Sequence, residues 1–127
     1  MAARADDLVN LVPSRISAIS MIAASCILGL FSKSYDAKRS VHIWIRDRYR
    51  QKSPNSGQTE SVCAGALGVR LLGDAFYNGK IVRKPHIGDD LRPVEAEDIK
   101  RAVRLMYLTE AVCTVAVLSV ALILIFR

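Results

Sequence analysis

The amino-acid sequence predicts an all-α integral membrane protein in which two transmembrane helices flank a turn-rich, partly helical cytoplasmic segment. Residues 16–32, ISAISMIAASCILGLFS, carry no charge, and residues 105–126, LMYLTEAVCTVAVLSVALILIF, contain only Glu110. The chain has a net charge of +6, and its Lys and Arg side chains gather beside these two runs. Because both basic flanks belong to residues 33–104, the positive-inside rule predicts that this segment is cytoplasmic and both termini are outside.

The first fifteen residues are expected to form a short amphipathic segment. Asp6 and Asp7 precede a group of apolar side chains, and Pro13 follows within the same stretch. Proline lacks a backbone N–H and restricts the residue before it, so Pro13 should end or kink this helix before the first span. The apolar side chains of the segment are Leu8, Val9, Leu11 and Val12.

The two apolar runs differ in length. At about 1.5 Å per helical residue, residues 105–126 reach roughly 33 Å, which exceeds the hydrocarbon core of about 30 Å. Residues 16–32 reach only about 26 Å and would need Arg15 and Lys33 to extend toward the headgroups. The alternative for this shorter run is a buried helix of a soluble bundle.

A basic helix is predicted directly after the first run, in YDAKRSVHIWIRDRYR. Helical spacing puts Val41, Ile45 and Trp44 toward one side and basic residues on the rest. One interpretation places this helix on the inner membrane surface, with Trp44, Tyr35 and Tyr49 at headgroup depth. The equally favoured alternative is a solvated basic helix that continues the first span.

Residues 53–90 are rich in turns. SPNSG, NGK and IGDD each carry the Pro, Asn or Gly that tight turns require, including Gly79 and Gly88. Between them, ESVCAGALGVRLL is compatible with a helix whose small face would admit a close neighbour. That face comprises Ser61, Ala64, Gly65 and Gly68.

The last helix should begin near Glu95 and continue without a break into residues 105–126. Glu97 and Asp98 would lie in its first turn, where the helix dipole favours acids. Lys100, Arg101 and Arg104 follow before the apolar run begins. One long helix is therefore expected.

Several common chemistries lack their motifs in this chain. GALGVRLLG has neither the spacing nor the Lys-Ser or Lys-Thr ending of a Walker-type nucleotide loop. His42 and His86 have no recognisable companions for a nucleophilic triad, and with Cys63 they match no metal-ligand spacing. The three cysteines contain no close pair and are expected to be reduced thiols.

A set of polar residues on turns remains as the candidate site. Cations with two or three carboxylates suit phosphates, a bridging metal ion or an anionic cofactor. The alternative is ordinary turn chemistry with solvated charges. The set comprises Asn55, Glu60, Arg70, Asn78, Lys80, Lys84, Asp89, Asp90 and Arg92.

Four blocks of sequence resemble one known family. DDLVNLVPSRISA, SPNSGQTESVCAGALGVRL, KPHIGD and RPVEAEDIKRAVRLMYL are similar, in order and separation, to the C-terminal part of adenosylcobinamide-phosphate synthase, the cobalamin biosynthesis protein CobD/CbiB family. The resemblance covers essentially all of this chain but less than half of the family's usual length. It implies an inner-membrane enzyme that joins adenosylcobyric acid to aminopropanol phosphate, or aminopropanol, with ATP consumed in forming the amide.

Among the residues that match the family's blocks, we hypothesise functional roles for six. Glu60 and Asp89 are the candidates for catalysis, where they would hold the amine or a metal ion, and the resemblance suggests Mg²⁺ as that ion. Arg70, Lys84 and Arg92 are the candidates for binding phosphates, and Asn55 is a candidate for binding substrate. Pro13, Pro54, Gly57, Gly65, Gly68 and Gly88 are assigned structural roles. The remaining matches are Asn10, Arg15, Ser53, Pro85, Asp98, Arg101 and Arg104.

The expected partners are the corrinoid and amine substrates, membrane lipid, and either the family's N-terminal half or further copies of this chain. The chain departs from the family pattern at several positions, which loosens the assignment of an exact substrate. The departures are Ser56, Thr59, Ser61, Val62, Cys63, Leu72-Gly73 and Val94-Glu95-Ala96. Two other classes are weighed: a non-enzymatic two-span protein whose basic segment binds lipid or a partner subunit, and, less favoured, a soluble nucleic-acid binder.

Overall fold

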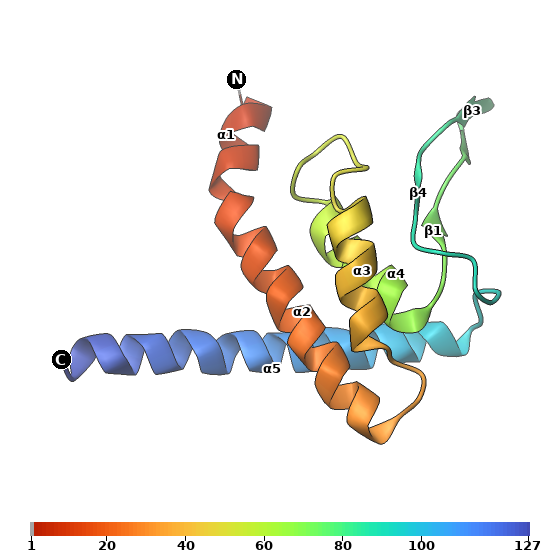
Figure 1. The fold of residues 1–127 in the computed structure, drawn as a ribbon. Helices are drawn as coiled ribbons and strands as arrows, with labels where there is room; N and C mark the ends of the chain where they lie inside the picture. Colours follow the sequence, from red (N-terminus) through yellow and green to blue (C-terminus); the bar gives the residue numbers. More distant parts are fainter. Residues whose placement is uncertain (1) are drawn as a thin grey trace.

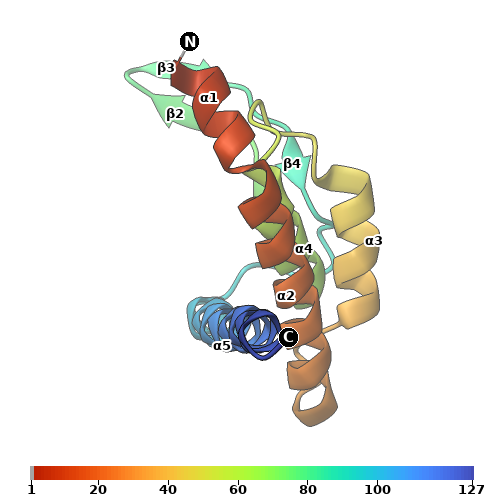
Figure 2. The same cartoon turned by 90° about the vertical axis from the view of Figure 1, so that its left-hand side faces the viewer.

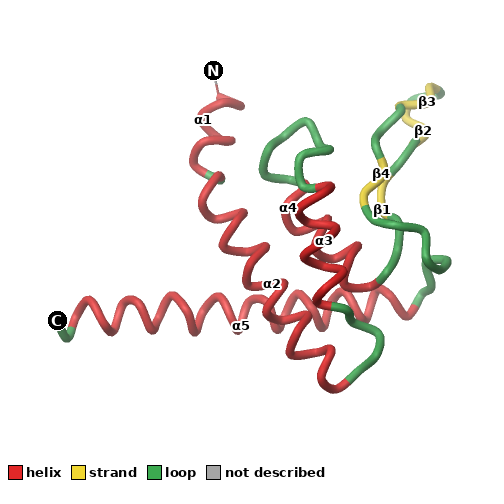
Figure 3. Tube along the Cα trace, viewed as in Figure 1, coloured by secondary structure: helices red, strands yellow, loops and turns green. Residues whose placement is uncertain are grey.

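The computed structural model describes the backbone of residues 2–127 and the side chains from residue 5 onward, so Met1 of the predicted N-terminal segment lies outside the described residues. The structure is mostly helical, as predicted, but the turn-rich segment also contains short strands that the sequence analysis did not predict (Figures 1 and 3). The elements are α1 Ala2–Val9, α2 Leu11–Phe31, α3 Ala37–Asp47, α4 Gly57–Leu67, β1 Leu71–Leu72, β2 Ala75–Tyr77, β3 Lys80–Val82, β4 His86–Ile87 and α5 Glu97–Ile125.

α1 and α2 are separated only by a kink at Asn10. Helical hydrogen bonds continue on both sides, from Asn10 N to Asp6 O at 3.0 Å and from Ser14 N to Asn10 O at 3.1 Å. Pro13 has no N–H to donate to the carbonyl of Val9, so the hydrogen-bond ladder is interrupted at this place. The apolar helix therefore begins at Leu11, five residues before the predicted start of the first span.

α2, α3 and α4 form a bundle in which α4 lies between the other two (Figure 2). A Cβ on Gly65 would lie 2.7 Å from both Arg39 O and Ser40 Cα, so glycine at this position lets α3 and α4 approach closely. Ser61, Ala64 and Gly65 are all buried. The predicted small-residue face of this helix is thus confirmed as a packing surface.

The apolar core joins this bundle to the first half of α5. Tyr35 is only 7% exposed, and its hydroxyl donates to Arg101 O at 3.1 Å. Tyr35 therefore belongs to the protein core and does not present its ring to lipid headgroups, as one interpretation of this helix expected. Its ring packs in the protein core with Ala24, Ala66, Leu67, Val69 and Leu105.

The short strands form two separate antiparallel pairs. β1 pairs with β4, so Leu71 lies opposite Ile87, while β2 and β3 form an exposed hairpin. Asn78 and Gly79 connect the hairpin with φ angles of 47° and 75°. This is the left-handed backbone of an Asn-Gly hairpin turn, which agrees with the turn predicted at NGK.

α5 is one continuous helix whose two halves have different surroundings. Glu97 and Asp98 lie in its first turn, as predicted, and Leu105 and Thr109 are buried against the bundle. The second half projects away from the rest of the chain, and its large apolar side chains are exposed (Figure 1). By length and composition, both α2 and α5 are able to cross a membrane.

The contacts of Asn55 disagree with the predicted topology. Its Nδ2 donates to Asp7 O at 2.8 Å, and its Oδ1 accepts from Arg15 Nη1 at 2.9 Å. A hydrocarbon core of about 30 Å cannot separate groups that share hydrogen bonds. Residues 7–15 and the loop around Asn55 therefore lie on one side, whereas the positive-inside rule placed them on opposite sides. α2 packs in a helical bundle, and in this respect it resembles the alternative considered for residues 16–32, a buried helix of a soluble bundle.

Candidate functional site

Asp47 organises the first group of charges, at the end of α3. This fully buried carboxylate accepts hydrogen bonds from Arg46 Nε at 2.7 Å and Nη2 at 2.8 Å, and from Gly88 N at 2.9 Å. Arg50 Nε lies 3.1 Å from it. Burial alone would raise the pKa of Asp47, but the hydrogen bonds from Arg46 and Gly88 outweigh burial and lower it. Asp47 thus holds the segment after β4 against α3.

Asp89, a predicted catalytic residue, belongs to the same cluster. Its Oδ1 lies 2.8 Å from Arg46 Nη1, and the adjacent Gly88 has a φ of 85°, which favours glycine. A Cβ on Gly88 would lie 2.7 Å from Ala64 Cβ, which explains why the segment can approach α4. The structure therefore places Asp89 in an ion pair.

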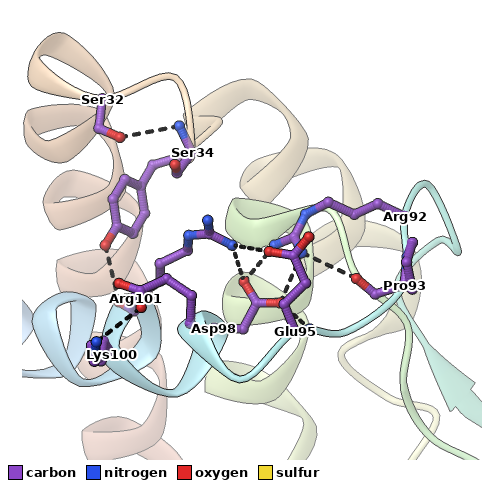
Figure 4. A network of polar contacts seen from close by, with 10 residues as sticks. Ser32, Ser34, Arg92, Pro93, Glu95, Asp98, Lys100 and Arg101 are labelled. Carbon is purple, nitrogen blue, oxygen red and sulfur yellow. Dashed lines mark hydrogen bonds and ion pairs between the residues drawn. The ribbon is translucent and has the colours of Figure 1, made fainter.

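A second charged cluster forms at the start of α5 (Figure 4). Arg92 donates two hydrogen bonds to Asp98, at 2.6 and 2.8 Å, and Arg101 Nη1 lies 2.8 Å from the same carboxylate. Asp98 also accepts from Glu95 N at 2.9 Å. The hydrogen bond from Arg92, with those from Glu95 N and Arg101, holds the pKa of Asp98 well below its usual range. Arg92, predicted to bind phosphate, is thus engaged inside the protein.

Arg70 is also paired, whereas Lys84 is not. Arg70 Nη2 lies 3.1 Å from Asp90 Oδ2, and both side chains are largely exposed. Lys84 is exposed on the connection between β3 and β4, and it forms no ion pair within the described part of the chain. Its positive charge acts on Glu60, where it opposes the effect of burial on the pKa of that carboxyl group.

Glu60 has surroundings unlike those of the other carboxylates. Its Oε2 is buried and has no hydrogen-bond partner among the described residues. The side chain lines a cavity of about 340 Å³ whose other walls are mainly apolar. Burial raises the pKa of Glu60 above its ordinary value. The lining residues are Met21, Thr59, Glu60, Cys63, Leu71, Ala102, Val103 and Met106.

The cavity of Glu60 adjoins two others. Thr59 lines it, and also a polar cavity of about 420 Å³ beside α1 and a cavity of about 350 Å³ that reaches Glu110 on α5. These three cavities, called the groove below, share Thr59 as a wall, and their linings pass from mainly polar residues beside α1 to mainly apolar residues around Glu60. Burial, and next the charge of Asp98, raises the pKa of the Cys63 thiol to about 11, so Cys63 is a poor nucleophile at neutral pH.

Asn55 stands at the polar end of this groove. In addition to its contacts with Asp7 and Arg15, its Oδ1 accepts a hydrogen bond from Ser14 Oγ at 3.1 Å. Ser53 Oγ donates to Asp7 Oδ1 at 2.7 Å, so the SPNSG turn is fastened to α1 and the start of α2. Pro54 O accepts from Gln58 Nε2 at 2.9 Å, and Gly57 allows the start of α4 to approach Arg48 O.

The predicted site residues are therefore divided among different environments. Lys84 acts on Glu60, Asp89 belongs with Arg46, and Arg92 belongs with Asp98. Sequence reasoning missed the central roles of Asp47 and Asp98. The alternating RDR of residues 46–48 and the Asp98–Arg101 spacing were the available indications. Within the described part of the chain, no three His, Cys, Asp or Glu side chains gather as a metal site.

The structure defines a class: mostly helical proteins that carry helices long and apolar enough to cross a membrane, here α2 and α5. The family model described as CobD/Cbib protein matches residues 1–106. The chain belongs to this family, which confirms the resemblance found in its sequence blocks.

Curated relatives named cobalamin biosynthesis protein CobD are similar over most of the chain. The protein from Streptococcus sanguinis is 47% identical over 107 residues, which cover 84% of this chain and 32% of that protein. The proteins from Desulfotalea psychrophila and Citrobacter koseri are 43% and 39% identical over 85% and 98% of this chain, and 31% and 38% of their own lengths. This chain spans about a third of these relatives. No solved structure matches it.

Proposed function

We propose that this chain contributes to the step of cobalamin biosynthesis that joins adenosylcobyric acid to aminopropanol, or its phosphate, through an amide bond. The observation that carries the proposal is the 39–47% identity to proteins named for cobalamin biosynthesis, over most of the chain. The product would be adenosylcobinamide or its phosphate. ATP would convert the carboxylate to an acyl phosphate, and the amine would then displace phosphate.

Glu60 is the residue that we assign to the amine. An amine attacking an acyl phosphate must lose a proton as the C–N bond forms and the C–O bond to phosphate breaks. The unpartnered Oε2 of Glu60 supports this role, since it is able to accept a hydrogen bond from the amine and take up that proton. Its raised pKa brings the carboxyl group closer to the range in which it exchanges protons.

The residues of this chain do not by themselves fit a bound Mg²⁺ ion. Mg²⁺ usually binds one or two carboxylates together with substrate phosphates. Of the two proposed ligands, Asp89 is engaged by Arg46, and Glu60 faces an apolar cavity. We therefore assign no step to a metal held by this chain. ATP would supply the activating phosphoryl group, but no residue is assigned to it.

We place the site at the cytoplasmic face of the cell inner membrane, with α5 as the anchor. Its exposed apolar half supports this, because the side chains of Leu122, Ile123 and Phe126 are more than half exposed. α2 is a less suitable span, since α3 and α4 pack along it and carry charged side chains.

The experiment is growth that depends on converting cobyric acid to cobalamin, with substitutions made in a full-length family protein carrying this segment. Glu60→Ala and Glu60→Gln should abolish growth, because neither side chain takes up the proton of the amine. Cys63→Ala, in the same cavity, is the matched control and should grow normally. Growth of both Glu60 variants would reject the site and favour the alternative, a non-enzymatic membrane protein whose basic segment binds lipid or a partner subunit.

We also propose that residues 1–127 act together with the remainder of the family's length. One third of a relative offers few surfaces on which to enclose a ligand as large as a corrinoid. Residues 1–127 alone should not restore synthesis in a strain lacking the enzyme, but should restore it weakly when the remaining part is supplied as a separate chain. Rescue by residues 1–127 alone would instead favour completion of the site by several copies of this chain.

A further inference from the structure

A cavity of about 310 Å³ lies between the turn that follows α2 and the start of α5, and we call it the basic cavity. A second cavity, of about 220 Å³, adjoins it and shares Lys33, Ser34 and Arg92 as walls. Neither cavity shares a lining residue with the cavity of Glu60. The residues that line the basic cavity are Lys33, Ser34, Arg92, Glu95 and Arg101.

The two arginines of the basic cavity are held in place but retain free donors. Arg92 and Arg101 converge on Asp98, to which Arg92 donates from both terminal nitrogens and Arg101 from Nη1 (Figure 4). Arg101 Nη1 also donates to Glu95 Oε2 at 3.2 Å. A guanidinium group carries N–H donors on all three of its nitrogens, and Arg101 Nε and Nη2 donate to no described residue. This edge of Arg101 is therefore available to a ligand.

Lys33 supplies a positive charge that the protein does not compensate. The two arginines of the basic cavity are matched by two carboxylates, those of Glu95 and Asp98. Lys33 is exposed and forms no ion pair with a described residue. The cavity therefore keeps a net positive charge.

The turn that carries Lys33 and Ser34 is fixed beside α5. The hydroxyl of Tyr35 donates to Arg101 O at 3.1 Å, and Asp36 N donates to Ala66 O at 3.0 Å. The Ser34 hydroxyl takes part in no hydrogen bond with a described residue, although it lines the cavity. A donor from this turn and donors from α5 are thus positioned around one space before any ligand binds.

We propose that the basic cavity is a binding site for a phosphate group. Lys33 supplies the charge, and the Ser34 hydroxyl and the free edge of Arg101 donate hydrogen bonds to the phosphate oxygens. Arg92 positions Arg101 through their shared partner Asp98. The phosphate belongs either to a soluble phosphoester or to a lipid headgroup. This site does not rest on the proposed function.

The position of this site differs from the phosphate site expected from the sequence. That expectation grouped Arg92 with Arg70 and Lys84, but neither of these two lines the basic cavity or the cavity that adjoins it. The structure groups Arg92 with Lys33 and Arg101 instead.

The test is calorimetric titration of inorganic phosphate into the chain, held in a zwitterionic detergent at constant ionic strength. Lys33→Gln should raise the dissociation constant at least about fivefold, because it removes a charge-assisted contact, and Lys33→Arg should keep it within about threefold. Ser34→Ala leaves every charge in place and should raise the constant at least about threefold. Lys38→Gln is the matched control, since it removes the same charge from an exposed position outside the cavity, and it should change the constant less than about twofold.

The source of the phosphate is distinguished in phosphatidylcholine nanodiscs that carry equal negative charge as phosphatidic acid or as oleate, which has no phosphate. Weaker binding of inorganic phosphate with phosphatidic acid than with oleate would identify a lipid headgroup, and equal binding would identify a soluble phosphoester. No binding by the unmodified chain would overturn the proposal. Equal losses in Lys33→Gln and Lys38→Gln would also overturn it, because they would show attraction by overall charge. Growth of the Glu60 variants has no bearing on these results.

Discussion

Asp47 and Glu60 are both carboxylates held against the same bundle, yet their surroundings are opposite. Asp47 is fully buried and surrounded by donors from Arg46, Arg50 and the backbone of Gly88. Glu60 has one buried oxygen without a partner and faces an apolar cavity. A buried charge whose hydrogen bonds are all made inside the protein stabilises one arrangement of the chain, whereas an unsatisfied acceptor beside a cavity is available to a ligand.

The largest effect is expected for Asp47→Ala. Removing this carboxylate leaves Gly88 N without a partner and leaves Asp89 as the only acidic partner of Arg46 among the described residues. Breaking a pair at a buried carboxylate costs about 3 to 5 kcal/mol. Urea unfolding in mild detergent, followed by the fluorescence of the single Trp44, measures the change. Asp89→Ala is the control, and it should cost less than about 1 kcal/mol because its ion pair is partly exposed. Equal losses in the two variants would contradict the central position of Asp47.

The next effect concerns the contact between the helices that carry these two carboxylates. Gly65→Ala should destabilise the protein by about 1 to 3 kcal/mol, because its Cβ would collide with the backbone of α3. Gly29→Ala is a matched helical control, since its Cβ would lie 3.2 Å from Tyr35 O and alanine is the better helix former. A change near zero in the same unfolding assay is expected for Gly29→Ala. An unchanged Gly65→Ala protein would show that α3 and α4 separate easily.

Glu60→Gln should give a smaller effect that depends on pH. The pKa of Glu60 is raised in the folded protein, so the folded state binds its proton more tightly and the original chain loses stability as pH rises through that range. Glutamine carries no charge, so the variant should gain stability relative to the original chain above that range and show no difference below the ordinary pKa. Asp47 and Asp98 have lowered pKa values and act oppositely, weakening the fold as pH falls. A difference between the two chains that does not change with pH would contradict the assignment to Glu60.

The smallest effect is expected for Lys100→Ala. Lys100 Nζ lies 3.0 Å from Glu97 Oε2, but both side chains are exposed on the first turns of α5. Such an exposed pair contributes little to stability, and raised salt concentration screens it. The free energy of unfolding of Lys100→Ala should differ slightly from that of the original chain at low salt and should equal it at high salt. A loss as large as that of Asp89→Ala would mean that exposed and partly exposed pairs cannot be separated here.

Local patterns predicted much of the fold. The long helix through residues 97–125, the small-residue face around Gly65 and the Asn-Gly turn all follow from residues that are close together in the sequence. The strands escaped prediction because β1 and β4 are two residues each and pair across an intervening hairpin. The contacts of Asn55 were not predicted for the same reason, since its partners Asp7 and Arg15 lie at least 40 residues away in the sequence.

The candidate site was less predictable than the fold. Residue type identified Glu60, Asp89, Arg70 and Arg92 as chemically able groups, but only the structure shows which of these charges already have partners. In the sequence, Arg92 and Lys84 look equally suitable for binding phosphate. In the structure, Asp98 engages Arg92, whereas Lys84 forms no ion pair with a described residue. The catalytic and binding roles themselves stay predictions.

The continuity of α5 ties the orientation of the bundle to that of the projecting half of the helix. Residues 97–125 contain no Gly or Pro, which are the usual causes of a helix kink. The hydrogen bond from Tyr35 to Arg101 O attaches the helix to the bundle. The packed and projecting halves of the helix therefore move as one rigid element. With the projecting half in lipid, the bundle cannot pivot independently of the helix. The cavity lined by Thr109, Glu110 and Cys113 would then keep a fixed place relative to the projecting half.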